Sequence, residues 1–445
     1  MQSKPKVTFT YINKLALPAL IAGIAEPLLS LTDTAIVGNI DVNATEALAA
    51  VGIAGSFLSA LIWILAQTRS AISAIISRYF GANRLDEIQS LPTQIIVINL
   101  ALSAILYFIS IAFVEFIFKL YNAEGLILNY TVAYYKIRAV GLPLTLLVFS
   151  IFGVFRGLQN TFWPMIISIT GLLLNVGLDF VLVFGIEGFI PAMHIEGAAY
   201  ASLTSQVVMA VMALYLFIKK TPFELKFQWP FNTEIKRLLL LSLNLFIRAL
   251  SLNIAIYFAN SYATAYGNNY IAAQTIAFQI WLFFAFFIDG YASVGNIVSG
   301  RLLGEKDYKS LWKLSIDLSK YAIVIAFILA IICFIFYIPI GKAFTQETEV
   351  LDSFYAIFWI VLLMQPLNAI AFVFDGLFKG LAEAVTLRNT LLIATFLGFI
   401  PVLLIGDYFD LKLYAIWIAF TVWMFLRTII LVIVFRRKYL VNTTI

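Results

Sequence analysis

Apolar residues run along the sequence in twelve long segments that are separated by short polar stretches. A hydrocarbon core about 30 Å thick is crossed by roughly 20 apolar residues in a helix, and each segment reaches that length. The pattern therefore predicts twelve membrane-spanning helices. Their expected ranges are 11–38, 47–77, 92–119, 127–151, 162–186, 197–218, 235–266, 270–299, 312–341, 350–375, 386–406 and 412–435.

Composition supports a membrane protein and excludes several kinds of chemistry. Only 12% of the residues are charged and 62% are hydrophobic, whereas a soluble domain carries about 25% charged residues. Cys333 and His194 are the single cysteine and histidine, so neither a disulfide framework nor a thiolate or histidine metal cluster is expected. The sequence has no phosphate-binding loop and no nucleophile elbow, which argues against ATP-driven transport and serine hydrolysis. We therefore expect neither an enzyme nor a bound cofactor.

The charges between the apolar segments predict the orientation in the membrane. Twenty Lys and Arg residues, from Lys4 to Lys438, fall on one side, against Lys119, Lys342 and Lys412 on the other. Such an excess of bases marks the cytoplasmic side. Both termini are therefore expected in the cytoplasm, and the net charge of +5 reflects orientation and not nucleic-acid binding.

Two motifs recur in the second half of the chain at one common interval. The base and glycine of Arg78–Gly81 return in Arg301–Gly304. The segment Gly153–Leu158 returns at the same interval as Gly376–Leu381, with glycine, aromatic, base, glycine and leucine in register. We call the spacing from Arg78 to Arg301 the repeat interval. Two matches at this interval indicate a duplication of six helices, with glycines allowing close helix packing.

The duplication predicts two lobes with the same orientation. They would be related by an axis along the membrane normal, with a cavity between them. The expected lobes are residues 1–220 and 235–445, joined by a cytoplasmic linker at 221–234 that is polar and contains Pro222 and Pro230.

Five acids fall inside the predicted spans, where a carboxylate costs about 2.5–3.5 kcal/mol on insertion scales. They are Glu26, Asp33, Asp179, Asp289 and Asp375.

The spacing of polar residues in the first lobe suggests a shared pocket. Glu26, Ser30 and Asp33 lie at i, i+4 and i+7, on one helix face. Asn175 and Asp179 are one turn apart on another helix. If both faces point inward, the carboxyls titrate as a coupled set and attract a small cation, which is the chemistry that a cation-coupled exchanger requires.

A structural interpretation remains open for these acids. Those of the first lobe can pair with the intramembrane bases Arg69, Lys136 or Arg138 and only stabilise packing. In the second lobe, Arg248 is the expected structural partner of Asp289, and Asp375 is also expected to be structural.

Two prolines lie in the first predicted span. Pro18 and Pro27 either hinge this helix or give it a static kink, and the sequence leaves both readings open.

Several short motifs together resemble the multidrug and toxic compound extrusion (MATE) family, and within it the DinF-like branch. They cover nearly the whole chain and are Leu17-Pro18, Thr32–Gly38, Arg156–Thr161, Asn175–Asp179, Gly197-Ala198, Ile288–Ala292 and Phe374–Phe378.

The resemblance implies a V-shaped pair of six-helix bundles that exports drugs by alternating access, driven by H⁺ or Na⁺. Its coupling site maps to Asp33, Asn175 and Asp179, where Na⁺ can also bind, with Thr204 as the hydroxyl from the sixth span. Glu26 and Ser30 join Asp33 and Asp179 as candidates for binding cargo.

The expected partners are amphipathic, cationic small molecules and the lipid bilayer, with no nucleic acid. The expected state is a monomer in a bacterial-type cytoplasmic membrane. The alternative function is a lipid-linked oligosaccharide flippase of the same superfamily, which often has more spans and a basic cavity.

Overall fold

The computed structural model describes residues 6–41, 43–186 and 188–440, without the side chains of residues 26, 30, 31, 63 and 64. The described residues form helices, with one isolated bridge between Ile186 and Ile190 and no named strand. Ten stretches are long and apolar enough to cross a membrane, and two bent helix pairs complete twelve spans if each pair crosses once. The prediction of an all-helical membrane protein is confirmed.

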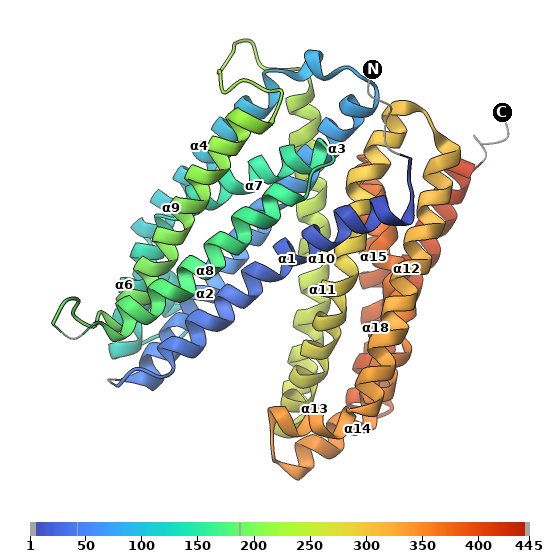
Figure 1. Ribbon diagram of the computed structural model, residues 1–445. Coiled ribbons are helices and arrows are strands. Elements are labelled where there is room, and N and C mark those ends of the chain that lie inside the picture. Colours follow the sequence, from blue (N-terminus) through green and yellow to red (C-terminus); the bar gives the residue numbers. More distant parts are fainter. Residues whose placement is uncertain (1–5, 42, 187, 441–445) are drawn as a thin grey trace. The chain divides into compact units, whose positions relative to one another are not determined.

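The first half of the chain contains the first six spans (Figure 1). Its elements are α1 (Phe9–Val37), α2 (Ala44–Leu65), α3 (Gln67–Gly81), the short η1 (Leu85–Ile88), α4 (Leu91–Ala112), α5 (Val114–Lys119), α6 (Gly125–Ala139), α7 (Leu142–Gly157), α8 (Phe162–Phe184) and α9 (His194–Lys220).

The second half repeats this order. Its elements are α10 (Glu234–Tyr266), α11 (Asn268–Glu305), α12 (Tyr308–Ile335), α13 (Tyr337–Phe344), α14 (Thr348–Leu363), α15 (Gln365–Gly380), α16 (Ala384–Ile393), the π-helical turn η2 (Ala394–Phe399), α17 (Ile400–Tyr408), α18 (Leu413–Phe435) and the π-helical η3 (Arg436–Leu440).

The fourth and tenth spans are both broken in the middle. The axis turns by 44° between α6 and α7 and by 51° between α14 and α15. Pro143 and Pro366, which are separated by the repeat interval, stand at the start of α7 and α15. Proline lacks the N–H for the preceding turn and its ring clashes with the carbonyl four residues earlier. The bends thus follow from the same residue at the same place in each half.

The recurring glycines are positions of close helix packing. A Cβ on Gly153 would lie 2.8 Å from the carbonyl oxygen of Arg69 on α3. A Cβ on Gly376 would lie 2.0 Å from the carbonyl oxygen of Ala292 on α11. Arg69 and Ala292 are themselves separated by the repeat interval, so the duplicated glycine serves the same contact in both halves.

Contacts divide the chain into two compact units. One comprises residues 1–16, 77–83 and 240–445, and the other comprises residues 17–76 and 84–239. The segment predicted as a linker packs on the second of these units, where Gln94 donates to the carbonyl of Gln228 at 2.7 Å and accepts from the N–H of Asn232 at 2.9 Å. The lobe boundaries predicted from the sequence remain a prediction.

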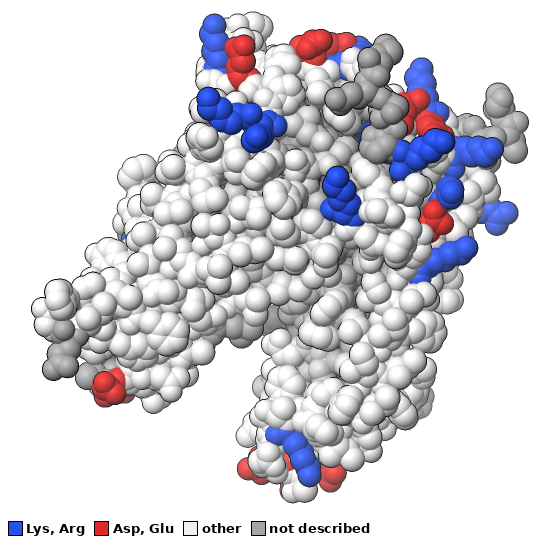
Figure 2. Space-filling model, in the orientation of Figure 1, with Lys and Arg blue, Asp and Glu red and all other residues white. Residues whose placement is uncertain are grey.

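The outer surfaces of the helices are apolar, as a lipid environment requires. Along α12 the exposed large side chains include Phe327, Ile328, Ile331 and Ile335. In Figure 2, charged side chains gather toward the ends of each unit and the flanks between are nearly free of them. Backbone polar groups on such flanks are satisfied within the helices, so the fold suits a bilayer.

Candidate functional site

Two carboxyl groups come together inside the unit that contains α8 and α9. Asp33 comes from α1, Asn175 and Asp179 from α8, and Ser202 from α9. None of the four is more than 2% exposed. We call these four residues the carboxylate cluster.

Hydrogen bonds hold Asp33 in the carboxylate cluster. Its Oδ2 accepts from the hydroxyl of Ser202 at 2.8 Å. With its amide nitrogen turned toward Asp33, Asn175 donates to Oδ1 at 3.0 Å, and its amide oxygen accepts from the backbone N–H of Ser202 at 3.3 Å. Asp179 is near enough for its carboxyl group to hydrogen-bond to that of Asp33, while its Oδ1 has no partner among the described residues. The carboxylate cluster thus has an acceptor to spare.

The approach of α9 to α8 depends on small residues. A Cβ on Gly197 would lie 2.5 Å from the carbonyl oxygen of Leu182 on α8. Ala198 is fully buried one turn before Ser202. Because both positions are small, the Ser202 hydroxyl reaches Asp33 and the Asn175 amide.

The structure brings together three of the four residues expected at the coupling site. Asp33, Asn175 and Asp179 meet, but the hydroxyl from α9 belongs to Ser202, whereas Thr204 is exposed. Two positions along a helix turn the side chain by about 200°, so only one of these hydroxyls can face the cluster. The signal in the sequence for Ser202 was its place among the small residues Gly197, Ala198 and Ala201.

Two candidates for binding cargo, Glu26 and Ser30, belong to α1. The side chains of Glu26 and Ser30 lie outside the described residues.

The bases considered as structural partners lie in three different settings. Arg69 stacks over the ring of Phe149 at 5.0 Å, and Lys136 is exposed. Arg138 stacks over the ring of Tyr134 at 5.9 Å, within electrostatic range of Asp33 and Asp179. Of these three bases, Arg138 is the one that lies within electrostatic range of both acids.

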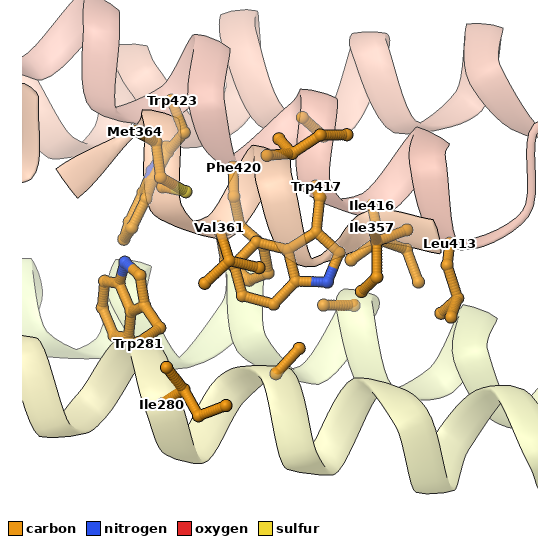
Figure 3. Close-up of a cluster of buried hydrophobic side chains, with 14 of the residues drawn as sticks. Ile280, Trp281, Ile357, Val361, Met364, Leu413, Ile416, Trp417, Phe420 and Trp423 are labelled. Carbon is orange, nitrogen blue, oxygen red and sulfur yellow. The ribbon is translucent and has the colours of Figure 1, made fainter. Parts of the chain in front are cut away.

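The second half offers an internal comparison for the polar residues. The positions one repeat interval after Tyr134, Arg138 and Asp179 are occupied by Ile357, Val361 and Val402. Ile357 and Val361 lie in a buried hydrophobic cluster with Trp281 and Phe420 (Figure 3). Val402 packs against this cluster. The same fold therefore accepts apolar side chains at these positions, so the helix arrangement does not require Asp179 or Arg138.

A second cluster of buried charge, made mostly of bases, lies in the unit that contains α15. The Nε of Arg248 on α10 donates to Oδ1 of Asp375 at 3.1 Å, and its Nη2 pairs with Oδ2. Lys379 Nζ lies 3.4 Å from Oδ2 and Arg427 Nη2 lies 3.7 Å from Oδ1. Three bases thus surround one acid.

The partner expected for Arg248 was therefore wrong. The sequence suggested Asp289, but Arg248 pairs with Asp375. Ile288 and Gly290 are buried on α11, so Asp289 between them points outward and is exposed. Asp375 therefore takes the place beside Arg248 that was predicted for Asp289, and its structural role stays a prediction.

Comparison with known proteins identifies the family. The MatE family model matches residues 18–181 and again residues 241–409. The starts of these two segments are separated by the repeat interval. The chain belongs to the MatE family. It is thus a multi-pass membrane transporter and not an enzyme, as expected from the sequence.

Relatives of this MatE protein include members from bacteria. DNA damage-inducible protein F of Escherichia coli is 25% identical over 96% of this chain and 91% of its own length. This match confirms the predicted DinF-like branch. Multidrug export protein MepA of Staphylococcus haemolyticus is 24% identical over 80% of this chain and 78% of its own.

Solved structures share the fold of this MatE chain. A MATE crystal structure in a bent conformation gives a TM-score of 0.88 at 22% identity, covering 98% of this chain and 96% of the other. A multidrug resistance MATE family transporter of the MOP superfamily, in an outward-facing conformation, gives 0.85 at 22% identity over 98% and 96%. At this identity the likeness shows the fold alone.

Proposed function

We propose that this MatE protein is a secondary active multidrug efflux antiporter. It exports amphipathic, cationic small molecules by alternating access in exchange for H⁺ or Na⁺. The names of its relatives support drug export, and the buried carboxylate cluster supports cation coupling.

The single observation that carries the proposal is the buried pair of Asp33 and Asp179. Two acids in an apolar lobe need a cation, because a buried uncompensated charge is costly. A proton satisfies the pair by bridging the carboxyls. A sodium ion satisfies it through oxygens from both carboxyls, the Asn175 amide and the Ser202 hydroxyl. Differential affinity for that cation in two conformations is what couples its entry to cargo exit.

The experiment uses purified protein in proteoliposomes with pH and sodium gradients imposed separately. Asp33→Asn and Asp179→Asn should insert in near-normal amount and lose gradient-driven export of a fluorescent cation such as ethidium, whereas Glu at either site retains some export. Glu115→Gln, an exposed acid on α5, is the matched control and should export normally. Export at the wild-type rate by both Asn variants, at equal reconstitution, would refute this mechanism.

Ser202 belongs to the proposed coupling site in place of Thr204. Ser202→Ala removes a hydrogen bond to Asp33, so it should weaken the apparent affinity for the coupling ion by about 5- to 30-fold, equivalent to roughly 1–2 kcal/mol. Thr204→Ala changes an exposed hydroxyl on the same helix and should leave that affinity unchanged. The opposite ranking would return the site to Thr204.

A lipid-linked oligosaccharide flippase is the second candidate, favoured by the bases around Asp375. Such bases would suit the pyrophosphate of a lipid-linked sugar. Arg248 nevertheless forms an ion pair with Asp375, and Arg427 lies over the rings of Phe372 and Trp423. Both bases therefore already have partners within the protein. A liposome assay with labelled lipid decides between the two, because an antiporter leaves the lipid on its original leaflet.

Pro18 is the better placed of the two hinge candidates. The boundary between the compact units falls in α1 between Ala16 and Leu17, next to Pro18, while α1 continues through Pro27 as well. We therefore propose Pro18 as the hinge. Pro18→Ala should slow export more than Pro27→Ala does, at equal protein amount.

The remaining proposals concern location and assembly. The protein acts as a monomer in a bacterial-type cytoplasmic membrane, with both termini in the cytoplasm. The excess of bases in one set of loops supports this orientation.

A further inference from the structure

Arg138 is a half-buried base at the bend of the fourth span. It lies in the last turn of α6, one residue before its end at Ala139. A helix C-terminus is the favourable end for a positive charge. Beyond the bend, Gly141 lies so close to α9 that its Cβ would meet the side-chain oxygen of Gln206. The Nε and Nη1 atoms of Arg138 are shielded from solvent, so this part of the guanidinium lies in the packed interior.

The donors of Arg138 are only partly used. Its Nε and Nη1 are buried and have no hydrogen-bond partner among the described residues. The Tyr134 ring and hydroxyl occupy the remaining part of the guanidinium. Asp179 Oδ1, which is also buried, has no donor among the described residues, and Asp179 lies within electrostatic range of Arg138. Arg138 thus has unused donors beside the carboxylate cluster, and Asp179 of that cluster has an unused acceptor. This arrangement allows Arg138 to share the two acids with a mobile cation.

The charges near Arg138 come from few elements. Asp33 on α1 and Asp179 on α8 are the acids that act on it, besides Tyr134 on its own helix. α9 faces this end of α6 with Gln206. α2 and α5 also pack on α6. The charged residues of α2 and α5 are Glu46 on α2 and Glu115 and Lys119 on α5.

The charges of this site do not cancel without one added cation. Asp33 and Asp179 contribute two negative charges when ionised, and Arg138 contributes one fixed positive charge. We propose that Arg138 is the fixed counter-charge of the carboxylate cluster and limits it to one monovalent coupling cation per cycle. This inference rests on the proposed antiport and identifies a residue that sets its stoichiometry. Val361 occupies the equivalent place in the second half, so the fold alone gives no reason for a base there.

Removing the fixed charge should change the ion count. In Arg138→Met, two acids remain without a base, so neutrality requires two cations. The test uses proteoliposomes that are clamped at zero membrane potential, so that the charge of the cargo does not affect its gradient. The measured quantity is the cargo concentration gradient that a tenfold H⁺ or Na⁺ gradient sustains. One ion per cargo sustains about a tenfold gradient and two sustain about a hundredfold gradient, because each ion adds the same free energy. Arg138→Met should move this ratio from one to two, and an unchanged ratio would overturn the proposal.

A double variant provides the second test. Asp179→Asn alone leaves one acid balanced by Arg138, so no cation is needed and export stops. Arg138→Met combined with Asp179→Asn leaves one acid without a base, so the need for one cation returns. This double variant should recover export that Asp179→Asn lacks, at a ratio of one. A double variant as inactive as Asp179→Asn, with both well folded, would contradict the role of Arg138.

Controls separate this inference from the antiport itself. Lys136→Met removes an exposed base two residues away and should leave the ratio at one. Arg138→Lys keeps the charge and should also keep the ratio, and it is informative if Arg138→Met folds poorly. Normal export by both Asp33→Asn and Asp179→Asn would refute the proposed function. An inactive Asp33→Asn together with an unchanged ratio in Arg138→Met would refute only the counter-charge.

Discussion

Asp375 contacts three bases, of which Arg248 and Arg427 are buried and Lys379 is half-buried, and its neutralisation should be more damaging than the loss of any one base. In Asp375→Asn, Arg248, Lys379 and Arg427 lose the acid that lies 3.1–3.7 Å from them. At an effective dielectric constant of about 20, each attraction at such distances is worth roughly 4–5 kcal/mol. Part of this is offset because Asp375 no longer has to be desolvated.

The expected net loss follows from buried pairs in general. Removing one partner of such a pair costs about 3–5 kcal/mol. Arg248→Met should cost less, about 0–2 kcal/mol, because Lys379 and Arg427 still neutralise Asp375 and one repulsive base has gone. The order Asp375→Asn worse than Arg248→Met is the central expectation.

The assay is survival of a monodisperse protein peak after a heat step in detergent. A loss of 3–5 kcal/mol lowers the midpoint by roughly 6–20 °C for a folding unit of this size. Asp289 is exposed in the same unit and acts electrostatically on Lys379, but the close contact with Arg248 belongs to Asp375, so Asp289→Asn is the comparison variant and should shift the midpoint by little. If Arg248→Met is the more damaging, or if Asp289→Asn equals Asp375→Asn, the assignment of the ion pair fails.

Two further predictions follow from packing and orientation. Gly376→Ala should destabilise the protein by about 1–3 kcal/mol or more and more than Gly153→Ala, because its Cβ meets backbone at 2.0 Å and not 2.8 Å; equal midpoints in the heat-step assay would contradict this. In a background with Cys333 replaced, a cysteine at Asn43 should react with an impermeant thiol reagent from outside intact cells and one at Asn83 should not, whereas equal labelling would refute the orientation.

The spans could be predicted from the sequence because burial in lipid is a property of whole segments. The breaks inside them depend on single residues. Pro143 and Pro366 gave a usable signal for two breaks. No residue type in the sequence signals the breaks at Phe113, where α4 ends, and at Phe336, where α12 ends. These two residues are separated by the repeat interval and have nearly the same backbone angles, φ −111° and −103° with ψ 19° and 20°.

The site was predictable to the extent that its residues share a helix. Asn175 and Asp179 are one turn apart, so their common face is visible in the sequence. Choosing Ser202 over Thr204 requires the rotation of α9 after the loop at 185–193, which spacing does not provide. The partner of Arg248 required the packing of α10 against α15, so Asp289 and Asp375 were equally available from the sequence.

The duplicated glycines and the carboxylate cluster are constrained in different ways. Gly153 and Gly376 face backbone atoms, so any side chain there is blocked whatever cargo the protein carries. The positions of Arg138 and Asp179 accept Val361 and Val402 in the other half, so their chemistry is free to diverge. Searches of genomes that rely on the spacing of the glycines would therefore recover the architecture without regard to its energy source. If the carboxylate cluster couples transport as we propose, sorting the recovered sequences by the residues at the cluster positions would then group them by the ion that drives them.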